Sequence, residues 1–239
     1  MSEPSQWISP DLYPDVFQSG GLGPLLEDAA RRAGVDLGPI DLVHGVQGFW
    51  EVMLSTDRGV VNVVLGSDRR VFLVHVSVES HPWASGSTED LTEVVRVADL
   101  WRRGTTLHRL HERFPFMTYT RLAEGYERGN PIEAQWQDLL EREDLRQIRP
   151  LLQAAQADEV LGPLFPMVTH YTLARFDLDH WNRGAAQVRI GLTPDGRYQV
   201  EASWVDGSRL VDSISEAVTL ANEFIHARRN GAADEGPVP

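Results

Sequence analysis

The sequence has 239 residues, enough for one large domain or two small ones, and is 42% hydrophobic and 24% charged, like a soluble globular protein. It contains 22 arginines but no lysine or cysteine, which excludes Schiff-base chemistry, phosphate-loop lysines, thiolate nucleophiles, disulfides and cysteine-ligated metals. The formal net charge of −13 argues against binding to nucleic acid or anionic membranes. The first residues are polar, unlike a secretion signal, and no apolar run is long enough to span a membrane. We therefore expect a cytoplasmic protein.

The first half of the chain is predicted to form a helix, three strands and a second helix. Apolar residues at helical spacing begin at Leu22 and stop at Gly34, a residue type that commonly ends helices. Turn residues divide the next apolar stretch into three β-rich runs, which are residues 49–56, 60–65 and 71–78. Neighbouring runs are expected to pair as two hairpins. Ser87 or Thr88 would then cap the second helix.

The second half repeats this order roughly 125 residues later, a spacing that suggests a duplicated unit. A helix is expected over residues 151–161, and Ser213 with Glu216 forms a capping box for a final helix. Three strands are expected between these helices, at residues 168–177, 186–192 and 198–205. The alternative is that the same order of elements recurs by chance in α+β proteins.

The hairpin around Pro194-Asp195-Gly196 allows its register to be predicted. A three-residue loop opposes Ile190 with Val200 and Arg189 with Glu201, so that apolar meets apolar and opposite charges meet. This register predicts one apolar face that packs in the core, formed by Val188, Ile190, Tyr198, Val200, Ala202 and Trp204.

These patterns predict an α+β fold of two α-βββ-α units, a pseudo-duplicate if the repeat is real, joined by a helical bridge. In the bridge, Asn130-Pro131 has the residues of a helix start. The expected divisions are a loose N-terminal segment at 1–21, the first unit at 22–103, the bridge at 104–149, the second unit at 150–229 and a disordered tail at 230–239.

Four residues of the second half are candidates for catalysis, namely His170, Tyr171, Arg175 and Asp179. The histidine would act as a general base, and the tyrosine or arginine would stabilise an anion. On a strand, His170 and Tyr171 point to opposite faces, so they act together only if the strand bends. The alternative for His170 is a histidine packed in the core.

Two further pairs have the spacing of metal ligands. His108 and His111 lie three residues apart on a predicted helix, but no third ligand is evident, and a structural role is the alternative for His111. Asp177 and Asp179 would lie on one side of an extended chain and could hold Mg²⁺, with a solvated turn as the alternative. We assign no metal and no cofactor from these pairs.

Several motifs in the middle of the chain carry a family resemblance. They are Ala98-Asp99-Leu100-Trp101, Glu112-Arg113-Phe114-Pro115-Phe116, Leu122-Ala123-Glu124, Glu127-Arg128-Gly129, Glu133-Ala134-Gln135-Trp136, Leu164-Phe165-Pro166 and Leu173-Ala174-Arg175-Phe176. Over residues 95–205 the chain resembles a bacterial family of natural product biosynthesis proteins, a domain of unknown function. The resemblance implies a metabolic setting but no reaction and no catalytic residues.

Two functions are compatible with these observations. The first is an accessory protein of natural-product biosynthesis that binds a partner protein or peptide. The second is a small-molecule enzyme or cyclase of such a pathway, which uses histidine, tyrosine, arginine or carboxylate groups in a cleft between the two halves. The expected partner is therefore a protein or a pathway intermediate, with a homodimer as a further option.

Overall fold

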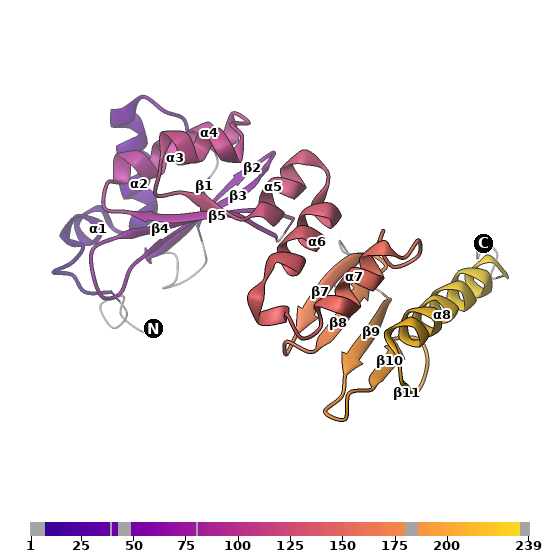
Figure 1. The fold of residues 1–239 in the computed structure, drawn as a ribbon. Helices are drawn as coiled ribbons and strands as arrows, with labels where there is room; N and C mark the ends of the chain where they lie inside the picture. The colour runs from indigo at the N-terminus through magenta and orange to yellow at the C-terminus, as the bar shows by residue number, and fades with distance from the viewer. Residues whose placement is uncertain (1–7, 39, 43–48, 80, 180–185, 235–239) are drawn as a thin grey trace. The chain divides into compact units, whose positions relative to one another are not determined.

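The structure of the protein is a computed structural model, which describes residues 8–38, 40–42, 49–79, 81–179 and 186–234. The chain divides into two compact units, Met1–Glu127 (unit 1) and Arg128–Pro239 (unit 2). Each unit combines an antiparallel sheet with helices (Figure 1), which confirms the predicted α+β class and the two-unit arrangement. The division falls inside the segment 104–149 that was expected to be a bridge.

Unit 1 contains a six-stranded antiparallel sheet in which sequential strands are neighbours. The strands are β1 (Ile40–Leu42), β2 (Glu51–Thr56), β3 (Gly59–Leu65), β4 (Phe72–Val78), β5 (His81–Thr88) and β6 (Thr118–Tyr119). The helices are α1 (Pro14–Ser19), α2 (Leu22–Ala33), α3 (Leu91–Arg102), α4 (Leu107–Arg113) and α5 (Arg121–Arg128).

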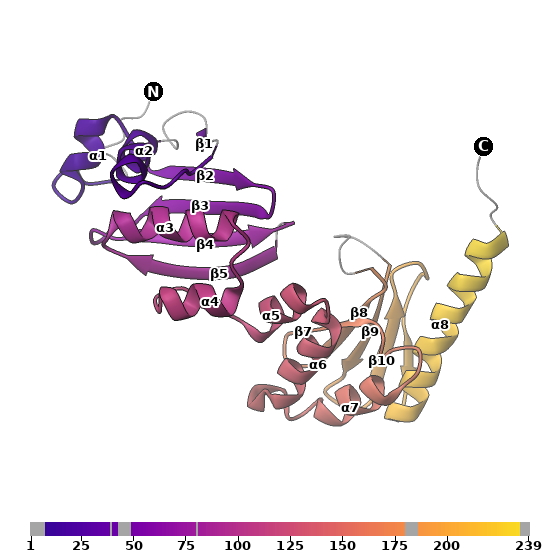
Figure 2. The same ribbon diagram turned by 90° about the horizontal axis from the view of Figure 1, so that it is seen from above.

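The two faces of this sheet differ in chemistry because alternate side chains of each strand point to opposite sides. One face packs against α2 and α3 (Figures 1 and 2) and buries residues such as Val63, Val74 and Val76. We call the opposite side the polar face of unit 1. It carries one row of directly paired residues across five strands, Met53, Asn62, His75, Ser85 and Thr118.

The structure adds strands to the three predicted in unit 1. β5 was missed because its serines and glycine resemble a loop, although its pairing with β4 extends from His81 to Thr88. The prediction that Ser87 or Thr88 caps the next helix is wrong for the same reason. Asp90 is the N-cap of α3, and its carboxylate accepts a 2.7 Å hydrogen bond from the backbone N–H of Thr92.

The N-terminal helix α1 is fastened to the turn between β3 and β4 by Tyr13. The Tyr13 side chain is fully buried, and its hydroxyl lies 2.9 Å from the carbonyl oxygens of Gly66 and Val71. The same hydroxyl accepts a 2.9 Å hydrogen bond from the N–H of Val71. Arg70 adds two 2.8 Å hydrogen bonds to Asp15, which lower the pKa of that carboxyl.

Replacing Tyr13 with Phe should lower the free energy of unfolding by about 1–3 kcal/mol, because it leaves the buried Val71 N–H without its partner. Urea denaturation of the full chain measures the loss. Tyr198→Phe in unit 2 is the control, because that ring is only half-buried. Equal losses in the two variants would contradict the assigned role of the Tyr13 hydroxyl.

Unit 2 contains a five-stranded antiparallel sheet in the order β11-β10-β9-β8-β7. The strands are β7 (Phe165–Thr169), β8 (Leu173–Asp177), β9 (Gln187–Leu192), β10 (Tyr198–Ala202) and β11 (Arg209–Val211). The helices are α6 (Pro131–Glu141), α7 (Arg149–Ala157) and α8 (Ile214–Asp234), with a 3-10 turn at Glu143–Leu145. α6 and α8 pack on the sheet, and α7 lies between them (Figure 1).

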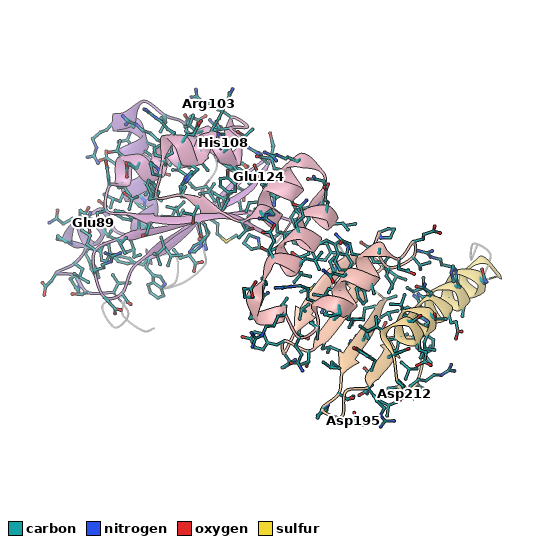
Figure 3. The ribbon with its side chains drawn as sticks, viewed as in Figure 1. Glu89, Arg103, His108, Glu124, Asp195 and Asp212 are labelled. Carbon is teal, nitrogen blue, oxygen red and sulfur yellow. The ribbon has the colours of Figure 1, made fainter. Side chains whose placement is uncertain are left out.

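The register predicted for the β9–β10 hairpin is confirmed. Ile190 pairs with Val200 and Arg189 with Glu201, and Asp195 lies at the tip (Figure 3). Of the predicted apolar face, Val188, Ile190, Val200 and Ala202 are buried, whereas Tyr198 and Trp204 are half-buried. Hydrogen bonds from Thr193 and Arg197 lower the pKa of Asp195 to about 2.

The capping box of the last helix is also confirmed. Glu216 accepts a hydrogen bond from the Ser213 N–H at 3.1 Å, and the Ser213 hydroxyl accepts one from the Glu216 N–H at 3.2 Å. α8 extends to Asp234, and residues 235–239 of the expected tail lie outside the described residues. No helix within the described ranges combines the length and apolar character needed to cross a membrane.

The strand expected over residues 168–177 is two strands, β7 and β8, joined by a turn. His170 and Tyr171 in this turn have φ angles of +52° and +60°. This left-handed conformation is usually taken by Gly or Asn, so neither residue marked a turn in the sequence. β11 was also missed, and unit 2 therefore has five strands in place of the three expected.

Candidate binding pocket of unit 1

The four residues proposed for catalysis are spread along the β7–β8 hairpin. His170 and Tyr171 are exposed in the turn, so both predictions for His170, a strand position and burial in the core, are wrong. Arg175 lies within β8, where it donates a 3.0 Å hydrogen bond to Asp177. Asp179 is exposed two residues beyond the end of β8.

The structure brings only two of these four residues next to each other. His170 and Tyr171 are neighbours at one end of β8, and Asp179 lies beyond its other end. With a rise of about 3.3 Å per strand residue, the turn and Asp179 are on the order of 20 Å apart. The four side chains therefore do not converge on one reacting group.

The two pairs with metal-ligand spacing have other partners. His108 on α4 (Figure 3) contacts Glu112 at 3.2 Å, and His111 Nδ1 lies 2.7 Å from the carbonyl oxygen of Met117. His111 is half-buried, which agrees with the structural role that was the alternative to metal binding. Asp177 pairs with Arg175. Within the described part of the chain, no group of three or more His, Asp or Glu side chains is placed to hold a metal.

A hollow of about 520 Å³ lies at the β4–β5–β6 end of the sheet in unit 1. We call it the unit-1 pocket. The polar face supplies His75, Ser77, Ser85 and Thr118, and α5 supplies Leu122 and Tyr126. The remaining lining residues are Val76, His81, Pro82, Trp83, Ala84, Tyr119 and Thr120. Three strands and one helix therefore contribute side chains to one concave site, the usual form of a ligand pocket.

A β-bulge places Trp83 at this pocket. The pairing of β4 with β5 runs from Val76–Ala84 directly to Ser77–Pro82, so Trp83 is the extra residue of β5. Bulges re-aim a side chain and increase the local twist of the strands. The Trp83 ring packs edge-on against Trp101 of α3, with 5.8 Å between their centroids.

A close approach at Gly86 positions the segment that leads into β6. A Cβ atom on Gly86 would lie 2.2 Å from the carbonyl oxygen of Phe116, so only glycine fits there. Phe116 belongs to the Phe-Pro-Phe motif of the family resemblance. The carbonyl oxygen of the next residue, Met117, forms a hydrogen bond with His111 Nδ1. The His111 ring also packs edge-on against Tyr119, which lines the pocket.

An ion pair fixes the helix that forms one wall of the pocket. The Glu127 carboxylate at the end of α5 accepts a hydrogen bond from the Arg58 guanidinium and another from the backbone N–H of Leu107 at 3.1 Å. The guanidinium lies 3.8 Å from the centroid of the Trp101 ring. The Arg58 and Glu127 side chains are only 24% and 15% exposed, so the pair is largely shielded from water.

The chemistry of the lining suits hydrogen bonding and ring packing. The His81 and Tyr126 rings lie side by side, with 5.0 Å between their centroids. Burial raises the pKa of Tyr126, so its phenol keeps its proton and remains a donor. The pocket has no local signature in the sequence, because its residues come from a strand that resembles a loop and from separate parts of the chain.

Fold and pocket together define an α+β protein of two sheet-and-helix units, one of which has an aromatic-lined hollow. Residues 130–229 match a family of unknown function (DUF6193), a match that covers every strand of unit 2 and none of unit 1. No curated protein and no solved structure matches the chain. The unit-1 pocket therefore lies outside the matched region.

Replacing Gly86 with Ala should displace the Phe116 segment and lower the free energy of unfolding by about 1–3 kcal/mol, because backbone atoms would have to move. Gly191→Ala in unit 2 is the matched control. Its Cβ would lie 3.2 Å from the end of the flexible Leu173 side chain. Urea denaturation compares the two variants, and a loss at Gly86 no larger than at Gly191 would refute the close approach.

Proposed function

We propose that the chain is an accessory protein of natural-product biosynthesis that binds a peptide segment of a partner protein. The unit-1 pocket is the observation that carries this proposal. It is lined by rings of Trp83, Tyr119 and Tyr126, and it lies at the end of the polar face. Protein interfaces typically insert a few large anchor side chains into such hollows.

The surroundings of the pocket support a protein partner. His75, Ser85 and Thr118 are exposed, directly paired across neighbouring strands, and continue from the pocket onto the polar face. An apolar hollow bordered by hydrogen-bonding groups is the usual arrangement of an interface, with its dry centre and polar rim.

The metabolic part of the proposal depends on the family resemblance. The motifs from Ala98 to Phe176 resemble those of the natural product biosynthesis proteins. The family that matches residues 130–229 has an unknown function and so supplies no reaction. We therefore propose the pathway from the resemblance alone and the binding role from the pocket.

A small-molecule enzyme is the second candidate, and one observation favours it. His81 and Tyr126 lie in ring contact inside a single hollow, and imidazole and phenol groups serve as general acids and bases. Turnover of a pathway intermediate by the purified chain would support this candidate. Stable binding of a partner without turnover supports the accessory role.

Filling the pocket should abolish partner binding. Each protein encoded beside the gene for this chain is purified and mixed with the wild type, with Ser85→Trp and with Met53→Trp. Ser85 lines the pocket, whereas Met53 lies on the same face roughly three strand spacings, about 14 Å, away. Calorimetry should show at least a tenfold weaker affinity for Ser85→Trp and an unchanged affinity for Met53→Trp.

Two results would overturn the proposal. One is that no neighbouring gene product binds the wild type. The other is that Ser85→Trp binds the partner as tightly as the wild type does. Circular dichroism of both variants verifies that they are folded, because each adds a ring to an exposed position rather than to the core.

A further inference from the structure

Among the residues that the structure describes, the lining of the unit-1 pocket includes no Asp, Glu or Arg. Its polar groups are two imidazoles, two phenols and the hydroxyls of Ser and Thr residues. This is unusual in a chain with 35 acidic and 22 basic residues. A charged ligand group in such a lining would lose hydration without gaining an opposite charge, which costs free energy.

Charged side chains on the neighbouring elements either pair with an opposite charge or do not line the pocket. The Arg58 guanidinium lies 5.8 Å from the Trp83 ring centroid, but it is paired with Glu127. α5 also carries Arg121 and Glu124, which have opposite signs and do not line the pocket. None of these charged residues therefore gives a ligand in the pocket a formally charged partner within the lining.

The rings determine the shape of the group that fits. Trp83, Tyr119, Tyr126 and His81 bring four aromatic rings to one hollow. Aromatic rings pair favourably in offset or edge-to-face arrangements, beyond the area they bury. The volume of about 520 Å³ lies within the roughly 300–1,000 Å³ of small-molecule sites. One ring system with a short substituent is therefore an appropriate occupant.

We infer that the unit-1 pocket selects an uncharged aromatic group, a planar ring with hydrogen-bonding substituents and no formal charge. This inference rests on the proposed function and names the group that the partner presents. The hydroxyl of Ser85 and the imidazole of His75 hydrogen-bond its substituents. The Thr118 hydroxyl donates to the Ser85 carbonyl oxygen at 3.2 Å and can accept a hydrogen bond from the same group.

Three probes that share one ring but differ in charge test this selection. Indole-3-acetamide is neutral, indole-3-acetate is an anion and tryptamine is a cation. Each is titrated into the full-length chain by calorimetry at about pH 8, above the range in which imidazoles ordinarily gain a proton. The amide should bind at least tenfold more tightly than either charged probe. Ser85→Trp should abolish this binding, and Met53→Trp should leave it unchanged.

Several results would overturn the inference. They are equal or tighter binding of the acetate or of tryptamine, binding of the amide that Ser85→Trp leaves intact, and no binding of any probe up to about 1 mM. Thr118→Trp fills the pocket from β6 and gives a second, independent blocked variant.

The two proposals can fail separately. In the first case, a protein encoded beside the gene binds the wild type but not Ser85→Trp, and the neutral amide binds no more tightly than the charged probes. The accessory role then stands, and the selection of an uncharged ring is wrong. If the amide binds selectively but no neighbour binds, the selection stands and the protein-binding role is wrong.

Discussion

Arg58 connects segments of unit 1 that are far apart in the sequence. From the turn between β2 and β3, its guanidinium reaches the Thr105 carbonyl, 47 residues away, and the Glu127 carboxylate, 69 residues away. Its flat face covers the Trp101 ring, which is itself fully buried. A charged pair so poorly exposed to water is tolerated only because each charge has partners on several sides. The position of α5, and with it one wall of the pocket, depends on this arrangement.

The pocket occurs where unit 1 departs from regular geometry. Trp83 is an extra residue in the β4–β5 ladder, and Glu79 before β5 has a φ of +48°. Gly86 lies so close to the Phe116 carbonyl that a Cβ atom would not fit between them. Each departure costs stability on its own, and such costs concentrate at functional sites. Unit 2 repeats the order of helix, antiparallel strands and helix, but its sheet carries Arg175, Asp177 and other charged residues opposite the core. The two units therefore share an architecture while presenting different surfaces.

The parts of the fold that the sequence predicted are those set by local patterns. The β9–β10 register follows from a turn containing glycine and from alternation on both strands, and the α8 cap follows from two residues three positions apart. β5 escaped prediction because its second half, Ala84 to Thr88, consists of small or polar residues that resemble a loop. The turn at His170 and Tyr171 escaped because those residue types rarely adopt a left-handed backbone. The contacts of Arg58 have no local signature, since its partners follow from the tertiary fold alone.

The most direct test of this account is a double-mutant cycle between Arg58 and Glu127. Arg58→Met keeps a long side chain over Trp101, and Glu127→Gln keeps an acceptor for the Leu107 N–H, so both variants remove mainly the charge–charge contact. The account predicts a coupling free energy of about 1–3 kcal/mol between the two positions in urea denaturation. Additive losses, with a coupling below about 0.5 kcal/mol, would show that the pair does not hold α5 in place.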